Sequence, residues 1–99
     1  MTNNQYTIEK QVQAEEDLID MWITGEGKWG EQQADKYYYE IEKGILILES
    51  HPKAGTELHQ CQGYRQLHIN RHVVIYRILD TTVHIIRVLG DEMDVQRHL

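Results

Sequence analysis

The last third of the chain, residues 63–99, alternates apolar and polar positions in the way that is typical of β-strands. Three runs rich in Val, Ile and Tyr predict strands near Tyr64–Ile69, His72–Leu79 and Val83–Leu89. The segments between them, Asn70-Arg71 and Asp80-Thr81-Thr82, have the composition of turns. Such short spacing favours an antiparallel meander, in which one face packs on a core and the other presents polar groups.

The first half of the chain has the four-residue spacing of amphipathic helices. Ala14, Leu18 and Trp22 predict a helix that begins near Val12 and ends at the glycines of Gly25-Glu26-Gly27. A second stripe predicts a helix from near Gly30 to before Pro52, because proline cannot continue a helix. Its members are Ala34, Tyr38, Ile41, Ile45 and Leu48. The intervening segment, GEGKWG, is short and predicts an antiparallel hairpin.

The remaining segments complete an α+β fold of the order β-α-α-β-β-β. Tyr6-Thr7-Ile8 predicts a short edge strand after a loose terminus at residues 1–5, and the tail after Gly90 is expected to be irregular or one helical turn. The 99 residues suffice for one domain, 1–99, with one core. We expect an N-terminal strand and a helical hairpin packed on a small antiparallel sheet. The expected core is Leu18, Trp22, Ile41, Ile45, Val74, Tyr76, Ile86 and Val88.

Three further residues of the helical region have expected places. Gly44, inside the second helix, indicates a point of close packing, because glycine costs about 1 kcal/mol relative to Ala there. Trp29 lies in the segment between the helices and is expected at the edge of the core. Tyr39 follows two tyrosines on the helix, and the rotation of about 100° per residue turns it toward solvent.

The charge balance limits the possible partners. With 10 basic and 16 acidic residues the net charge is -6, so direct binding of nucleic acid is not expected, because phosphates require a surplus of Lys and Arg. No apolar run approaches the roughly 20 residues that span a bilayer, and the N-terminus lacks the features of a signal peptide. Cys61 is the single cysteine and cannot form an internal disulfide. A cytoplasmic protein without membrane association is expected.

Arg65, Arg77 and Arg87 interrupt the apolar strands of this acidic chain and are the first candidates for a binding site. An arginine on a strand can hold a partner's carboxylate through two parallel hydrogen bonds. In that case the arginines would be solvated in the free protein. The alternative is pairing within the chain, which contributes about 0.2–1 kcal/mol for each exposed pair. Tyr39 is a further candidate, since aromatic residues are enriched at partner surfaces.

Catalytic chemistry has weaker support. Cleavage of RNA through its 2′-hydroxyl needs a base, an acid and cations that stabilise the developing charge. His72, Arg65 and Arg87 are candidates for these roles, but Asp91 and Glu92 follow the last strand and would repel phosphate. We therefore expect no catalytic residue.

Metal binding and thiol chemistry also have little support. The spacings His59-x-Cys61 and His68-x-x-x-His72 are not those of a structural zinc site. Cys61 lies between two glutamines, and nothing but His59 nearby resembles a base that would activate it. An incidental thiol is favoured, and we expect neither a metal nor another cofactor.

A series of short motifs occurs in a characteristic order along most of the chain. They are Ala14-x-x-Asp17-Leu18 with Trp22, Trp29-Gly30 with Ala34 and Tyr38, Pro52-x-x-Gly55, Gly63-Tyr64-Arg65, His72-Val73-Val74-Ile75-Tyr76-Arg77, Ile86-Arg87-Val88-Leu89 and Met93-Asp94-Val95-x-Arg97-His98-Leu99. Together they resemble the ParE/RelE family of toxins from type II toxin–antitoxin systems, and the ParE branch in particular. The resemblance extends from about Tyr6 to Leu99.

The resemblance implies a helical hairpin on a small antiparallel sheet, in agreement with the periodicity. It implies a toxin that binds and inhibits DNA gyrase, as ParE proteins do, without chemistry of its own. It also implies a cognate antitoxin, ParD-like and of the ribbon-helix-helix type, whose C-terminal segment wraps the toxin. That segment is expected to be acidic, amphipathic and disordered until bound. To the arginines and Tyr39 the resemblance adds Met93 and Asp94 as binding candidates.

Two positions depart from the family pattern. ParE-like chains usually carry a His after the last strand and an Arg before the Met-Asp pair, where this chain has Gly90 and Glu92. Two alternatives to gyrase inhibition remain open. One is a ribosome-dependent mRNA endonuclease of the RelE type, and the other is a detoxified homologue that only binds antitoxin.

Overall fold

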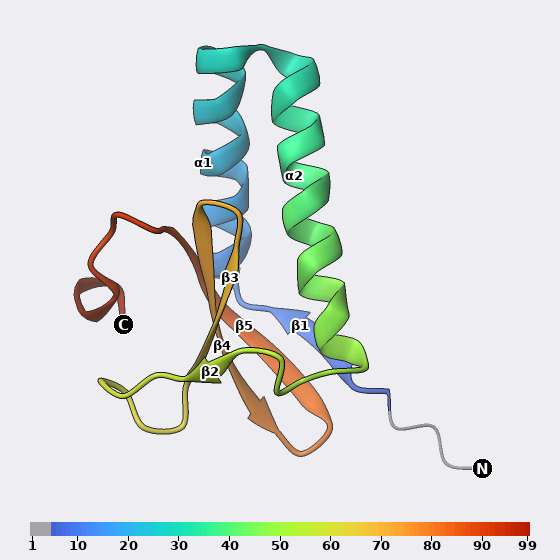
Figure 1. Ribbon diagram of the computed structural model, residues 1–99, viewed down its shortest axis with the longest axis vertical. Helices are drawn as coiled ribbons and strands as arrows, with labels where there is room; N and C mark the ends of the chain where they lie inside the picture. Colours follow the sequence, from blue (N-terminus) through green and yellow to red (C-terminus); the bar gives the residue numbers. More distant parts are fainter. Residues whose placement is uncertain (1–4) are drawn as a thin grey trace.

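The computed structural model describes residues 5–99, in which an α-helical hairpin packs on a five-stranded sheet (Figure 1). The strands are β1 Thr7–Lys10, β2 Thr56–Glu57, β3 Arg65–Ile69, β4 His72–Leu79 and β5 Thr82–Gly90. The helices are α1 Val12–Trp29 and α2 Glu31–Leu46, followed by the 3₁₀ turn η1 Ile47–Glu49 and, near the C-terminus, η2 Val95–His98. The predicted α+β order is confirmed. The loose terminus expected at residues 1–5 lies almost wholly outside the described residues.

The first helix is longer than its sequence indicated. α1 continues through Gly25 and Gly27 and ends at Gly30, whose φ of 90° favours glycine. A Cβ at Gly25 would lie 3.6 Å from the side chain of Ala34, so this glycine sits where the two helices approach closely. The predicted end at residues 25–27 is therefore wrong, and contact with α2 at Gly25 offsets the low helix propensity of that glycine. Only Gly30 separates the two helices, instead of the six-residue segment expected.

The sheet has the order β1-β5-β4-β3-β2. β3, β4 and β5 form the predicted antiparallel meander, and its turns place Asn70 and Asp80 at φ of 54° and 55°. Asn and Asp tolerate this left-handed conformation better than other side chains. β1 is an edge strand, as predicted, but it pairs in parallel with β5. Residues 11–81, which hold the helical hairpin and strands β2 to β4, connect the two strands, and a parallel pair needs a long crossover of this kind. The two-residue strand β2 was not predicted, because it is too short to show alternation.

The main core lies between the hairpin and the sheet. Six of the eight predicted residues are buried there, namely Leu18, Ile41, Ile45, Val74, Tyr76 and Val88. Ile86 is not among them, because β5 contains a bulge: Ile75 pairs with Arg87 and Tyr76 with Ile85, which leaves Ile86 as an extra residue. Ile85 takes the core position, and Ile86 packs on the opposite face of the sheet.

The two tryptophans are more exposed than expected. Trp22 is only partly buried at the border of the hairpin, where its indole N–H donates to Asp35 Oδ1 at 2.7 Å. Trp29 is 63% exposed at the end of α1, so the expected position at the core edge is wrong. Trp29 is the last residue of α1, at the end of the hairpin that extends beyond the sheet (Figure 1).

A second, smaller apolar cluster lies on the opposite face of the sheet. Its buried members are Leu58, Val73, Ile75 and Leu89, against which Tyr64 and Val95 pack. The loop before β3 and the C-terminal turn η2 therefore cover part of this face. Among residues 5–99 no helix is both long and apolar enough to cross a membrane.

Two close contacts fix how the helices and loops meet the sheet. A Cβ at Gly44 would lie 2.5 Å from Ile69 Cδ1, which confirms the predicted close packing of α2 on β3. The Tyr76 hydroxyl, in the core, donates to Pro52 O at 2.8 Å and accepts from Gly55 N–H at 3.1 Å. The turn after α2 is thus tied to the middle of the sheet.

Replacing Ile45 with Ala should lower the free energy of unfolding by about 2–5 kcal/mol, because it removes a packed aliphatic group and leaves a cavity. Chemical denaturation measures the loss. The neighbouring Leu46, 55% exposed on the same helix, is the control, and its replacement by Ala should change stability by less than about 0.5 kcal/mol. Equal effects at both positions would show that the helix face is assigned incorrectly.

Candidate functional site

The three strand arginines do not lie on one face of the sheet. Arg65 pairs with Tyr76, so it lies on the side of the helices, whereas Arg77 follows Tyr76 and points to the opposite side. Arg87 occupies the position after the bulge. A continuous basic strand face is therefore absent from residues 5–99, and each arginine has its own surroundings.

Arg65 supports a loop. Its Nη2 donates to Gly55 O at 2.7 Å and to Lys53 O at 3.4 Å, while its Nε is buried and makes no hydrogen bond to any described residue. These bonds add to those of Tyr76 in holding the turn that follows α2. A partner would have to compete with backbone carbonyls for this guanidinium.

Arg77 is the strand arginine most available to a partner. Its guanidinium carbon lies 5.2 Å from the centroid of the Tyr64 ring, a cation–π geometry. Within residues 5–99 it has no carboxylate in salt-bridge range, and its Nε is buried without a hydrogen-bond partner. An incoming carboxylate would therefore find a guanidinium that is positioned by an aromatic ring and not yet neutralised.

Arg87 is already neutralised within the chain. Its Nε and Nη2 donate to the two carboxylate oxygens of Asp17 at 2.8 and 2.9 Å, and the two side chains are only 17% and 12% exposed. Its Nη1 donates to His98 O at 3.1 Å, and Val88 N–H donates to Asp17 Oδ2 at 2.9 Å. The hydrogen bonds to Asp17 raise the pKa of Arg87. For Arg87, the expectation of a solvated side chain in the free protein is wrong.

A polar corner forms where β4 begins and β5 ends. Tyr37 of α2 places its hydroxyl 2.7 Å from His72 Nδ1 and accepts Arg71 N–H at 3.2 Å. Burial lowers the pKa of His72, and the nearby carboxylates of Asp91 and Glu92 oppose this effect. Burial raises the pKa of Tyr37. The one histidine that sequence reasoning placed near a catalytic role is thus hydrogen bonded to a helix.

The chain turns sharply after β5. Met93 N–H donates to Gly90 O at 3.0 Å, and Asp91 N–H donates to Arg71 O at 2.9 Å. Asp91 and Glu92 are exposed on this turn. The end of the strand therefore presents two carboxylates to solvent beside His72.

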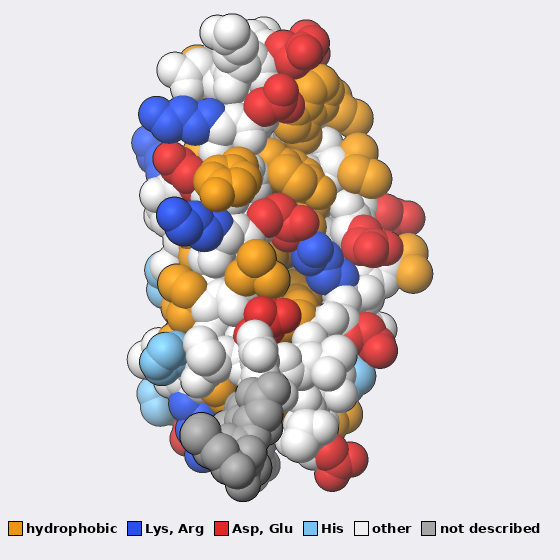
Figure 2. Space-filling model, turned by 90° about the vertical axis from the view of Figure 1, so that its right-hand side faces the viewer, with side chains coloured by type: hydrophobic (Ala, Val, Ile, Leu, Met, Phe, Trp, Pro, Cys, Tyr) orange, Lys and Arg blue, Asp and Glu red, His pale blue; other side chains and the backbone are white. Residues whose placement is uncertain are grey.

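The other binding candidates lie in two places, Tyr39 on α2 and the adjacent Met93 and Asp94 after β5. Tyr39 is 64% exposed on α2, as its helical position predicted, and Met93 is 40% exposed after the turn. Asp94 caps η2 by accepting Gln96 N–H at 3.1 Å. Figure 2 shows the side of the molecule that lies to the right in Figure 1, where hydrophobic side chains gather over the helical hairpin between acidic and basic groups. Whether these residues meet a partner stays a prediction.

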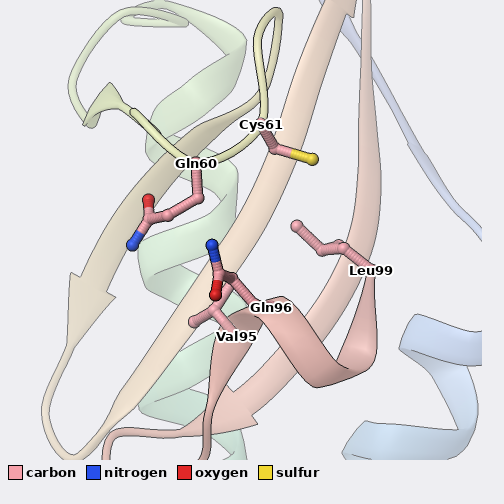
Figure 3. A pocket seen from close by; sticks show the side chains of 5 residues that line it. All are labelled: Gln60, Cys61, Val95, Gln96 and Leu99. Carbon is pink, nitrogen blue, oxygen red and sulfur yellow. The ribbon is translucent and has the colours of Figure 1, made fainter.

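A cleft of about 290 Å³ separates the loop before β3 from the C-terminal turn (Figure 3). It is lined by Gln60, Cys61, Val95, Gln96 and Leu99. A wider opening of about 560 Å³ adjoins it and shares Cys61 and Leu99. No charged side chain lines the cleft. Within the described part of the chain, no three His, Cys, Asp or Glu side chains are grouped so that they could hold a metal ion.

Comparison with known proteins decides the family. The family model described as "ParE toxin of type II toxin-antitoxin system, parDE" matches residues 8–95. The chain belongs to the ParE toxin family. Toxin ParE1 of Caulobacter vibrioides is 38% identical to this ParE chain over 87 residues, which are 87% of the chain and 90% of that protein. Toxin ParE1 of Mycobacterium tuberculosis is 32% identical over 88 residues, with the same coverage.

Solved structures share the fold of this ParE toxin. A chain of the chromosomal ParDE system from P. aeruginosa aligns with a TM-score of 0.82 at 18% identity, over 91% of this chain and 100% of that one. A chain of the RelBE2 complex from Mycobacterium tuberculosis aligns with a TM-score of 0.58 at 22% identity, over 87% and 98% of the two chains. At these identities the likeness concerns the fold alone.

Two contacts that tie up candidate site residues of the ParE toxin were not predicted from the sequence. They are the ion pair of Arg87 with Asp17 and the hydrogen bond of His72 with Tyr37. Asp17 was part of the family motif, but its carboxylate was not assigned to Arg87. The hydrogen bond between Tyr37 and His72 was not predicted either. Asp17 directly precedes the buried Leu18 on α1, and an acidic residue at such a position could have indicated a paired carboxylate. No sequence pattern indicated the hydrogen bond between Tyr37 and His72, because the two residues belong to segments far apart in the chain.

Replacing Arg87 with Ala should lower the free energy of unfolding by about 3–5 kcal/mol, since it leaves the carboxylate of Asp17 without its partner in a poorly solvated site. Thermal or chemical denaturation measures this. Arg97→Ala is the matched control, because that side chain is 84% exposed and lies 3.9 Å from Asp94, so its loss should cost less than about 1 kcal/mol. An unchanged stability of Arg87→Ala would refute the structural role.

The stability of the ParE toxin should fall as pH falls below about 6.5, in part through His72. Its folded-state pKa is lowered, so the unfolded chain binds the proton more readily and acid favours unfolding. His72→Gln should remove this part of the pH dependence, measured as the unfolding free energy between pH 5 and pH 7.

Proposed function

We propose that this ParE toxin arrests growth by binding and inhibiting DNA gyrase, without breaking or making a covalent bond, and that a cognate antitoxin neutralises it in the cytoplasm. Membership of the ParE family over residues 8–95 supports the toxin role. The solved relatives include toxin–antitoxin complexes, which supports an antitoxin as partner. Within the family resemblance, a ParD-like antitoxin of the ribbon-helix-helix type fits best.

The pairing of Arg87 with Asp17 supports a non-enzymatic mechanism most directly, and two further features agree with it. Arg87 is the candidate cation for stabilising a phosphorane, but its Nε and Nη2 both donate hydrogen bonds to Asp17. His72, which would act as base, has Nδ1 hydrogen bonded to Tyr37. Asp91 and Glu92 lie where an incoming phosphate would need positive charge. The three features together disfavour RNA cleavage at this strand end.

The relatives with RelE-type names do not outweigh this argument. The chain of the RelBE2 complex aligns with a TM-score of 0.58 at 22% identity, a likeness that concerns the fold and not the side chains. Function depends on the side chains that a fold carries. The endonuclease role is therefore the weaker candidate, and it serves as an outcome of the experiment below.

The antitoxin contacts are proposed on Arg65, Arg77, Tyr39, Met93 and Asp94. Arg77 is the strongest of these, because its charge is unpaired within residues 5–99 and Tyr64 holds it in place. Binding of a carboxylate there would cost little side-chain entropy of Arg77, because the Tyr64 ring already positions the guanidinium. Arg87, in contrast, is proposed to hold the toxin's own elements together, so its loss would affect antitoxin binding only through stability.

Inducible expression should arrest growth, co-expression of the cognate antitoxin should restore it, and the purified toxin should inhibit gyrase supercoiling. Primer extension on cellular mRNA should show no new discrete ends. Discrete ends that disappear in an Arg87→Gln variant whose fold circular dichroism verifies, with supercoiling unaffected, would revive the endonuclease alternative. Antitoxin binding without growth arrest would support the detoxified homologue.

The departure at Gly90 and Glu92 supplies a control for the last outcome. A Cβ at Gly90 would meet its nearest atoms at 3.7 Å, an ordinary contact, so the backbone at this position has room for a Cβ. Gly90→His with Glu92→Arg restores the usual family residues at both positions. If the unmodified chain is inactive and this variant arrests growth, the acidic turn accounts for the loss.

A further inference from the structure

The outer side of α1 carries an apolar stripe that no part of residues 5–99 covers. Val12, Ile19 and Ile23 are 68%, 55% and 56% exposed. At about 100° per residue, positions 12, 19 and 23 fall within about 40° of one another on the helix. The buried residues Ala14, Leu18 and Gly25 lie on the other side, where α1 packs against α2 and β5.

The stripe has the length and spacing of a helix-packing seam. Its ends, Val12 and Ile23, are about 16 Å apart along the axis, or three turns. Apolar residues at i, i+7 and i+11 are those that an antiparallel or parallel helix of a partner contacts. Trp22, partly buried beside the stripe and fixed by Asp35, extends the apolar surface at one end.

Acidic side chains flank the stripe on both sides. Glu15 and Glu26 lie along one border, and Glu16 and Asp20 along the other. No Lys or Arg occurs between Lys10 and Lys28. Within residues 5–99, none of these four carboxylates takes part in a salt bridge, although Glu16 contributes to the field at Arg87.

This charge pattern distinguishes between possible occupants. A second copy of the chain would bring four more carboxylates to the same seam, and nucleic acid or an anionic membrane surface would also be repelled. An acidic antitoxin segment, of the kind proposed for Arg77, would be repelled for the same reason. A helix with an aliphatic stripe and Lys or Arg on its borders would be attracted by both the apolar residues and the charges.

We propose that the outer face of α1 is a second docking surface, separate from the sheet arginines, and that it takes a cationic amphipathic helix of a partner protein. The surface is separate from the contacts proposed on the strand arginines, because it lies on the side of α1 opposite to the residues that pack on α2 and β5. Its apolar stripe provides contact area, and its acidic borders select a basic partner helix.

Two synthetic peptides of about 18 residues, roughly five helical turns, test the proposal. They share one aliphatic stripe and differ only in having lysines or glutamates on the borders. The full ParE chain should bind the lysine-bordered peptide at least about tenfold more tightly in calorimetric titration, and the preference should shrink as salt is raised. Equal binding of the two peptides would overturn the proposal.

Variants locate the surface. Ile19→Ser should weaken binding of the lysine-bordered peptide by about tenfold or more, because Ile19 lies at the middle of the stripe. Leu79→Ser is the control, since Leu79 is 45% exposed but lies beside the β4–β5 turn, away from α1 (Figure 1). Both positions are exposed, so both variants should fold, which circular dichroism verifies. Equal losses in the two variants would mean that attraction to the acidic protein is nonspecific and would also overturn the proposal.

Discussion

The ion pair between Arg87 and Asp17 joins three parts of the ParE toxin that are remote in the sequence. Asp17 belongs to the first helix, Arg87 to the last strand, and the carbonyl of His98 to the C-terminal turn. Asp17 also accepts the backbone N–H of Val88, so the carboxylate fixes the strand as well as the side chain. Hydrogen bonds to all of these groups offset the cost of partial burial, which an unpaired charge could not do. The position of the helical hairpin over the sheet depends on this contact together with the apolar core.

The same pair gives a structural reason for an arginine in a family motif. From the sequence, a strand arginine could either bind a partner or pair with a carboxylate of the same chain. Arg87 pairs within the chain, with Asp17. Arg77 can still bind a partner's carboxylate, because within residues 5–99 it packs on the Tyr64 ring and has no salt bridge. Two arginines with the same sequence context, each inside an apolar strand, therefore differ in what they can do for a partner. The difference arises from which elements the fold brings beside them.

Periodicity predicted the elements whose partners lie nearby in sequence. The helices, the meander and its two turns follow from local patterns, and so does the burial of residues such as Ile41 and Val74. The parallel pairing of β1 with β5 could not be predicted, because nothing in residues 7–10 specifies which distant strand they join. The bulge at Ile86 reversed the alternation of β5, since one extra residue shifts each later side chain to the other face. In the candidate site, the arginines were recognised by their chemistry, but Asp17 and Tyr37 are tertiary neighbours that spacing does not reveal.

The parallel pairing of the first and last strands has a consequence for synthesis of the toxin on the ribosome. Thr7 pairs with Thr82 and Lys10 with Ile85, so β1 has no partner until almost all of the described chain has left the exit tunnel. Contacts of such long sequence separation form late and slow the folding of a small domain. The helical hairpin can form earlier, but it has no sheet to cover it. A prematurely terminated chain that lacks β5 would therefore lack both the strand that β1 joins and the arginine that holds Asp17, and abortive translation would release no folded toxin.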